Sequence, residues 1–211
     1  VNATFSATAT GTGLTYQWQE NTGSGFTNIS GATGASYTKT GTTPAMSGYE
    51  YQVIVSGTCP TPVTSSAAVL TVNTLPAINV QPAAVTVCAG ADATFTVVAI
   101  GTGVTYQWQE NTGSGFSDIS GATSASYTIS PTTGSMNGYQ YQVVVTGTCS
   151  PVVTSSAVLL TVNTLPAITM QPTAQTVCEG DNATFLVVAT GTGLTYQWQE
   201  NTGSGFVNIA G

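Results

Sequence analysis

The chain has 211 residues, of which 41% are hydrophobic, 24 are Gly, 9 are Pro and only 4% are charged. The formal net charge is −7 and Lys39 is the single basic residue, so the chain has too little positive charge to bind a phosphate backbone or an anionic lipid surface. Nucleic acid is therefore excluded as a predicted partner, and no apolar run is long enough to predict a membrane span.

One stretch recurs and divides the chain into tandem copies. The letters TYQWQENTGSGF stand at residues 15–26, 105–116 and 195–206, a period of 90 residues. This period predicts one small β-sandwich per copy, because solenoid repeats are shorter. Thr, Ser, Val and Gly dominate the composition and no helical apolar spacing is sustained, so the predicted fold class is all-β.

The joints between copies are marked by a second recurring segment. Residues 73–78 read NTLPAI and residues 163–168 repeat them, with a turn-forming Asn and a stiff Pro. We therefore expect a first repeat at residues 1–74 that lacks its opening strand, a complete repeat at 75–164, and the first half of a third at 165–211. Because the sequence starts and stops inside a copy, we expect it to be a window cut from a longer array.

The complete repeat shows a series of short strands separated by Gly, Pro and Asn turns. Alternating apolar residues place Phe95, Val97, Tyr106 and Trp108 on inward faces. In chain order the predicted strands are a broken first strand at 79–81 and 85–87, then 93–100, 104–109, 116–119, 125–129, 139–146 and 156–162.

The positions of Trp108 on the third strand and Tyr141 on the sixth make the pattern specific. The chain resembles immunoglobulin-like domains, which carry such a Trp and such a Tyr together with two sheet-bridging cysteines. Those cysteine positions fall on Val97 and Val143 here, which implies an apolar contact between the sheets. The resemblance implies tandem immunoglobulin-like β-sandwiches whose core includes Trp18, Trp108, Trp198, Tyr51, Tyr141, Val97 and Val143. Residues 106–128 contain the pattern YQWQ…G…ISGATSASYT. In this pattern the chain resembles the repeats of giant Bacteroidota surface proteins, which include gliding-motility adhesins exported by the type IX system.

The four cysteines lie at two other positions of the repeat, so that a whole repeat would own one pair. Cys88 follows the first strand and Cys149 the sixth, while Cys178 and Cys59 occupy the equivalent positions in neighbouring copies. We predict a Cys88–Cys149 disulfide that closes a loop of about 61 residues and stabilises the repeat by roughly 4 kcal/mol. Cys59 and Cys178 would pair with residues outside the sequence. The alternative is four reduced thiols, but two cysteines per copy favour an oxidising compartment.

Residues that support catalysis or metal binding are scarce. The chain has no His and no Arg, so a general base near neutral pH would have to be a carboxylate. Glu110 and Asp118 flank one hairpin, but Asn28 and Asn208 replace the Asp in the other copies, so no shared acid pair is predicted. The oxygen-rich turn at residues 110–115 matches no calcium loop and is predicted to be a plain hairpin turn. We therefore predict no enzyme, no metal and no cofactor.

One surface is a candidate contact. With Tyr106 and Trp108 inward, alternation places glutamines on the outer face of two neighbouring strands, namely Gln107, Gln109, Gln140 and Gln142. This face is either merely solvated or a site for lateral self-association or surface glycans. The favoured function is a non-catalytic, semi-rigid, disulfide-locked stalk or adhesive segment of a long protein on the bacterial cell surface, partnered by its own neighbouring repeats. The alternatives are a multivalent glycan- or self-binding module, or an accessory region of a secreted enzyme.

Overall fold

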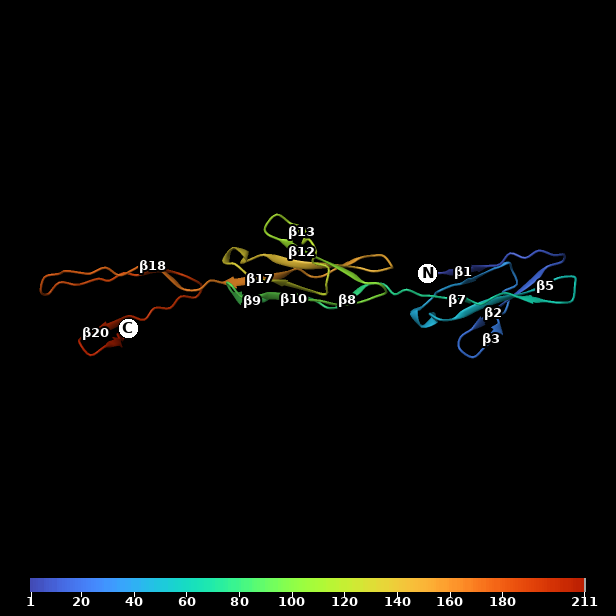
Figure 1. Cartoon of the computed structure of the whole chain (residues 1–211), viewed down its shortest axis with the longest axis horizontal. Coiled ribbons are helices and arrows are strands. Elements are labelled where there is room, and N and C mark those ends of the chain that lie inside the picture. The colour runs from blue at the N-terminus through green and yellow to red at the C-terminus, as the bar shows by residue number, and fades with distance from the viewer. Residues whose placement is uncertain (211) are drawn as a thin grey trace. The chain divides into compact units, whose positions relative to one another are not determined.

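The computed structural model describes residues 1–210 (Figure 1). Its elements are β-strands and two short 3₁₀ helices, which confirms the all-β fold class. The chain divides into two compact units. One unit comprises Val1–Pro76, Ile100–Val104 and Thr146–Pro151, and the remaining residues form the other.

The first repeat contains two sheets. Strand β1 pairs with β4, while β3, β2, β5 and β6 form the second sheet with β7 also paired to β5. Gln19 lies opposite Gln52, and Trp18 lies opposite Val53. The elements are β1 (Ala3–Ser6), β2 (Thr15–Asn21), β3 (Phe26–Asn28), β4 (Ser36–Lys39), η1 (Pro44–Met46), β5 (Glu50–Ser56), β6 (Val63–Thr64) and β7 (Ala68–Val69).

The second repeat adds strands at its edges. One sheet has the order β13-β12-β15-β17-β9 with β16 paired to β15, and the opposing strands pair as β10 with β14 and β11 with β8. The elements are β8 (Ala77–Val80), β9 (Val85–Cys88), β10 (Ala93–Thr96), β11 (Val98–Ile100), β12 (Thr105–Asn111), β13 (Phe116–Asp118), β14 (Ser126–Ile129), η2 (Gly134–Met136), β15 (Gln140–Thr146), β16 (Val153–Thr154) and β17 (Val158–Asn163).

An aromatic cluster forms the core of this repeat. Trp108 is fully buried, and its ring centroid lies 6.2 Å from Phe95 and 6.2 Å from Tyr127. Phe95 stacks on Tyr141 at 4.7 Å. The Trp108 Nε1–H donates to the Ser124 carbonyl at 2.9 Å, so burial leaves no unpaired indole donor.

The inter-sheet cysteine positions of the immunoglobulin pattern are filled by packed valines. Val97 and Val143 are both buried, at 3% and 0% exposure. The first repeat places Trp18 and Val53 in the same interior, with Tyr51 fully buried and Ala7 partly buried against them. Because these apolar side chains lie between the sheets, hydrophobic packing joins the sheets at the point where other immunoglobulin domains have sulfur.

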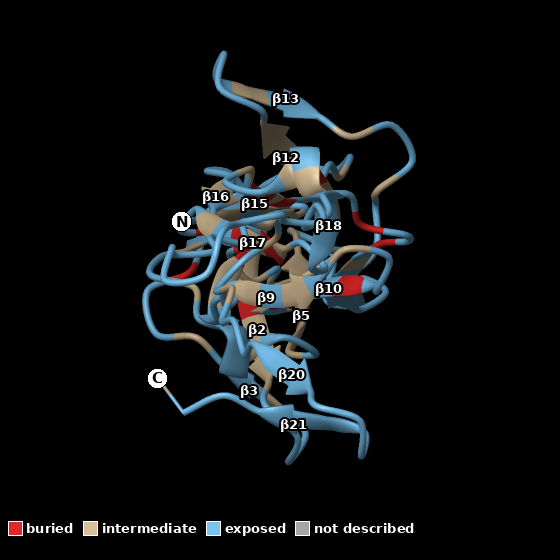
Figure 2. Ribbon diagram, turned by 90° about the vertical axis from the view of Figure 1, so that its left-hand side faces the viewer, coloured by how far each residue is buried: buried red, intermediate tan, exposed pale blue. Residues whose placement is uncertain are grey.

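The third segment has an exposed core face. Trp198 is 41% exposed and Phe206 is 70% exposed, and residues 165–210 include no counterpart of β14, β15 or β17. Figure 2 shows β20 and β21 in the colour of exposed residues. Trp198 thus differs from its buried equivalents Trp18 and Trp108. The strands here are β18 (Ala167–Met170), β19 (Val188–Thr190), β20 (Gln199–Asn201) and β21 (Phe206–Asn208).

The predicted disulfide between Cys88 and Cys149 is wrong, since all four cysteines are free. Strand β9 runs parallel to β17 and pairs Cys88 with Asn163 at the end of the sheet where β15 starts. Cys149 instead follows the far end of β15, a strand of seven residues. At about 3.3 Å per residue the two ends lie roughly 20 Å apart, whereas a disulfide needs Cα atoms within about 7 Å.

The turn residues at the first joint contact the loop that follows β11. The Thr74 N–H donates to Thr102 Oγ1 at 2.9 Å, and the Thr102 N–H donates to the Thr74 carbonyl at 3.2 Å. Thr164 and Thr192 repeat both bonds, at 2.9 and 3.1 Å. The same pair of hydrogen bonds therefore occurs at both NTLPAI segments of this chain.

Candidate interaction surface

The glutamines of the second repeat form a hydrogen-bonded row across three strands. Gln142 Nε2 donates to Gln109 Oε1 at 2.7 Å, and Gln109 Nε2 donates to Asp118 Oδ1 at 2.7 Å. We call Gln142, Gln109 and Asp118 the glutamine ladder. It links β15, β12 and β13 on the outer face of the sheet, as alternation predicts.

The first repeat carries the same ladder with Asn in place of Asp, and the third segment carries its last bond. Gln52 donates to Gln19 at 2.7 Å and Gln19 to Asn28 at 2.8 Å, while Gln199 donates to Asn208 at 2.9 Å. An amide oxygen and a carboxylate oxygen accept the same bond. The ladder therefore explains why position 118 tolerates both residue types, and it gives Asp118 a structural role.

The side chain of Gln107 donates hydrogen bonds to backbone carbonyls. Its Nε2 donates to the carbonyls of Trp108 and Ile119, both at 2.8 Å, which ties β12 to the chain after β13. Gln17 and Gln197 make the equivalent bonds. Gln140 is exposed and accepts a long bond of 3.4 Å from Asn111 Nδ2. Of the four predicted contact residues, Gln140 is therefore the one most available to a ligand.

The Gly-rich turn after β12 is closed by Asn111. Its Oδ1 accepts hydrogen bonds from the N–H groups of Gly113 at 2.9 Å and Gly115 at 3.0 Å. Both glycines have positive φ, of 119° and 101°, which suits residues without a side chain. Because the Asn oxygen is already used, this is a hairpin turn, and residues 1–210 hold no cluster of three or more side chains of the kinds that bind metals.

The ionisable groups are few and mostly separated. Lys39 Nζ lies 3.1 Å from Glu20 Oε2, and this hydrogen bond raises the pKa of Lys39. Burial raises the pKa of Tyr51, Tyr127 and Tyr141. These tyrosines pack in the two cores, so the shifts report burial rather than a pair of groups prepared for proton transfer.

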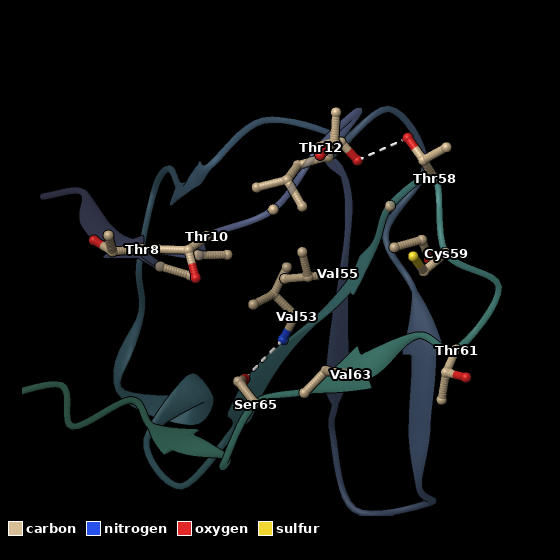
Figure 3. A pocket seen from close by; sticks show the side chains of 16 residues that line it. Thr8, Thr10, Thr12, Val53, Val55, Thr58, Cys59, Thr61, Val63 and Ser65 are labelled. Carbon is tan, nitrogen blue, oxygen red and sulfur yellow. Dashed lines mark hydrogen bonds between the residues drawn. The ribbon is translucent and has the colours of Figure 1, made fainter.

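A cavity of about 540 Å³ opens in the first repeat (Figure 3). It lies between the segment from Ala7 to Leu14 and the strands β5 and β6. Val53 and Val55 form its apolar floor, Val63 and Ser65 form one wall, and threonine hydroxyls surround its rim. The lining residues carry no charge. We call this cavity the first-repeat groove.

No helix in the described part of the chain is long and apolar enough to cross a membrane.

Comparisons with known proteins relate these features to other chains. The family described as Domain of unknown function (DUF8696) matches residues 1–74 and 78–164. Endoglucanase C of Cellulomonas fimi is 37% identical over 122 residues, which are 57% of this chain but only 11% of that enzyme. The chain thus spans a small part of that curated relative.

Solved structures show the same fold at low identity. The I-band fragment I67-I69 of titin superposes with a TM-score of 0.74 and 14% identity, covering 100% of this chain and 76% of that one. The complex of Dpr2 Ig1-Ig2 with DIP-Theta Ig1-Ig3 gives a TM-score of 0.51 and 15% identity, covering 74% of this chain and 59% of that one. These likenesses establish an immunoglobulin-like fold for the tandem repeats.

Proposed function

We propose a function from the premise that this chain belongs to the family described as Domain of unknown function (DUF8696). The chain is a non-catalytic spacer and adhesive segment of a long extracellular protein, built from immunoglobulin-like repeats at residues 1–74, 75–164 and 165–211. Its immediate partners are neighbouring repeats of the same chain.

The observation that carries this proposal is the repetition of structure without a unique site. The glutamine ladder, the Asn111-type turn and the Thr74–Thr102 bonds recur at equivalent positions in other copies. A spacer needs repeated modules and repeated joints, whereas an enzyme needs one set of catalytic residues that the rest of the chain holds in place.

We further propose that this extracellular protein stands on the bacterial cell surface. It is supported by the resemblance of the pattern YQWQ…G…ISGATSASYT, at residues 106–128, to giant Bacteroidota surface proteins of the gliding-adhesin type, which the type IX system exports. On such a filament, the outer face around Gln140 and Gln142 would meet surface glycans or another filament. Each contact would be weak, and many repeats would add through multivalency.

A second candidate is an accessory region of a secreted enzyme that degrades polysaccharides. The similarity to Endoglucanase C favours it, because the matched part is 11% of that protein and leaves ample length for a separate catalytic domain. In this case the repeats would hold the enzyme near an insoluble substrate or space its domains.

Retention on insoluble glycans distinguishes an adhesive surface from a plain spacer. The chain is incubated with cellulose and with bacterial surface polysaccharide, and the bound fraction is compared for Gln140→Lys and for the control Gln175→Lys, which changes an exposed Gln of the third segment. An adhesive face predicts that only Gln140→Lys lowers retention. Equal binding by both variants would remove the glutamine face from the proposal.

Spacing is measured separately. Small-angle X-ray scattering of chains with increasing numbers of the 75–164 repeat should show a maximum dimension that rises by about 30 Å or more per copy. A dimension that stays constant as copies are added would contradict the spacer function.

A further inference from the structure

The same pair of threonines stands at each joint between repeats. At the first joint the Thr74 N–H donates to Thr102 Oγ1 at 2.9 Å, the Thr102 N–H donates to the Thr74 carbonyl at 3.2 Å, and the two hydroxyl oxygens lie 3.1 Å apart. Thr164 and Thr192 make the same three contacts at the second joint, at 2.9, 3.1 and 3.2 Å. We call these the joint threonine pairs. Each one connects the end of a repeat to the Gly-Thr-Gly loop of the next.

The Gly-Thr-Gly loop is itself held within its own repeat. The Thr102 carbonyl accepts a hydrogen bond of 2.9 Å from the Thr148 N–H, in the loop that follows β15. The first repeat has the equivalent bond, also of 2.9 Å, from the Thr58 N–H to the Thr12 carbonyl. This bond therefore belongs to each repeat, whereas the joint threonine pair adds a connection to the repeat before it.

Two glycines let the joint lie directly against these loops. A Cβ at Gly101 would lie 2.8 Å from Pro76 Cα, and a Cβ at Gly147 would lie 3.4 Å from Pro76 Cβ. At the second joint a Cβ at Gly191 would lie 3.0 Å from Pro166 Cα. The joint proline thus occupies space that a side chain on the loop would fill, and its ring fixes φ at a residue that is already packed.

The preceding repeat holds the residue next to the threonine pair. At the second joint Asn163 is the last residue of β17, and its carbonyl accepts a hydrogen bond of 2.8 Å from the Ala89 N–H of the same repeat. Thr164 follows it directly and donates to Thr192 of the next segment. Two consecutive residues are therefore hydrogen-bonded to different repeats, with none between them.

The first joint has nearly the same arrangement. The Val72 N–H donates to Ser47 Oγ at 3.2 Å within the first repeat, and the Thr74 N–H donates to Thr102 Oγ1. Only Asn73 lies between a residue held by the first repeat and a residue held by the loop of the second. Few backbone torsions are left to vary at either joint, because the residues on both sides are hydrogen-bonded and the following Leu-Pro segment is packed.

We propose that the joint threonine pairs couple the rotation of neighbouring repeats, and that the Gly-Thr-Gly loop is the surface on each repeat that binds the last residues of the repeat before it. The partner of this surface is the preceding repeat of the same chain. Bending at the joint then requires the loss of at least one hydrogen bond. The benefit to the molecule rests on the spacer function proposed above, because coupled joints pass the direction of one repeat on to the next.

Nuclear spin relaxation of the backbone amides in the 211-residue chain tests the coupling, since it gives the rotational diffusion of each repeat. The first two repeats of the wild-type chain should tumble as one body. Thr102→Val keeps the side-chain volume but removes the acceptor of the Thr74 N–H, so the two repeats should tumble separately. Exchange of the Thr74 amide should be faster by roughly twofold to tenfold, as the loss of one hydrogen bond implies. Thr12→Val is the matched control, because Thr12 has the same place in the Gly-Thr-Gly loop of the first repeat and lies outside both joints.

A second variant provides the flexible reference. Two Gly residues inserted between Asn73 and Thr74 leave the threonine pair intact but add free backbone, so the repeats should again tumble separately. Separate tumbling in the wild-type chain would overturn the proposal, as would joint tumbling in Thr102→Val or in the insertion variant. None of these results decides the spacer function, which the increase in maximum dimension per added copy tests independently.

Discussion

The hydrogen bond between Ser155 and Val143 allows a quantitative comparison between two repeats. Ser155 Oγ accepts from the Val143 N–H at 2.9 Å and donates to the Ser156 carbonyl at 3.0 Å. Both residues are buried. Ser155→Ala would leave the Val143 N–H without a partner and out of reach of water, which costs about 1–3 kcal/mol of unfolding free energy.

The first repeat contains the matched control. Ser65 Oγ accepts from the Val53 N–H at 3.0 Å, but Ser65 is exposed in the first-repeat groove. Water can replace the hydroxyl after Ser65→Ala, so the expected cost is below about 1 kcal/mol. The two substitutions remove the equivalent hydroxyl from equivalent hydrogen bonds in the two repeats. They differ in the burial of the serine, because Ser155 is buried and Ser65 is exposed.

Amide hydrogen exchange of Val143 and Val53, followed by NMR, reports each repeat separately, and thermal unfolding gives the overall effect. We expect Ser155→Ala to accelerate amide hydrogen exchange throughout the second repeat. Ser65→Ala should accelerate exchange of the Val53 amide and leave the other amides of the first repeat nearly unchanged. If both substitutions had equal effects, the burial of Ser155 would not be what isolates the bond from water.

Three further predictions follow from single contacts. Gly101→Ala should destabilise the chain more than Gly113→Ala, because a Cβ at position 101 would lie 2.8 Å from Pro76 Cα, whereas Gly113 has open space around it. Both positions have positive φ, so Gly113→Ala should cost only backbone strain of about 1–3 kcal/mol, and melting temperatures compare the two variants. Burial raises the pKa of Tyr141, so the unfolded chain ionises first and stability, complete below about pH 10, should fall as pH rises above that value. Tyr141→Phe should reduce this fall in urea unfolding. Asn111→Ala should loosen the hairpin turn and speed exchange of the Gly115 amide, and an unchanged rate would show that the side-chain bond does not hold the turn.

Much of the fold was predictable because the repeat period and strand alternation are strong signals. The predicted strands at 85–87, 116–119, 125–129 and 139–146 agree with β9, β13, β14 and β15 to within a residue or two. The predicted strand at 93–100 is instead two strands, since β10 pairs with β14 while β11 pairs with β8. Alternation continues through Val97, so nothing in the local pattern marks the change of partner.

Two features of the candidate sites could not be predicted from the sequence, for a common reason. The spacing of Cys88 and Cys149 showed that each copy owns two cysteines, but the end of the sandwich at which each lies depends on β9 running parallel to β17. Alternation placed Gln107 and Gln109 on the outer face, yet it could not show that both amides are engaged within the repeat. Pairing between distant strands decides both outcomes, and a local pattern does not encode it.

The valines between the sheets have a consequence for where such a repeat can fold. Because Val97 and Val143 join the two layers by packing alone, no oxidation step is required for the native state to form. Molecules kept with dithiothreitol should melt at the same temperature as molecules kept in air. The packing of the two layers by Val97 and Val143 is therefore expected to form equally well under reducing and oxidising conditions.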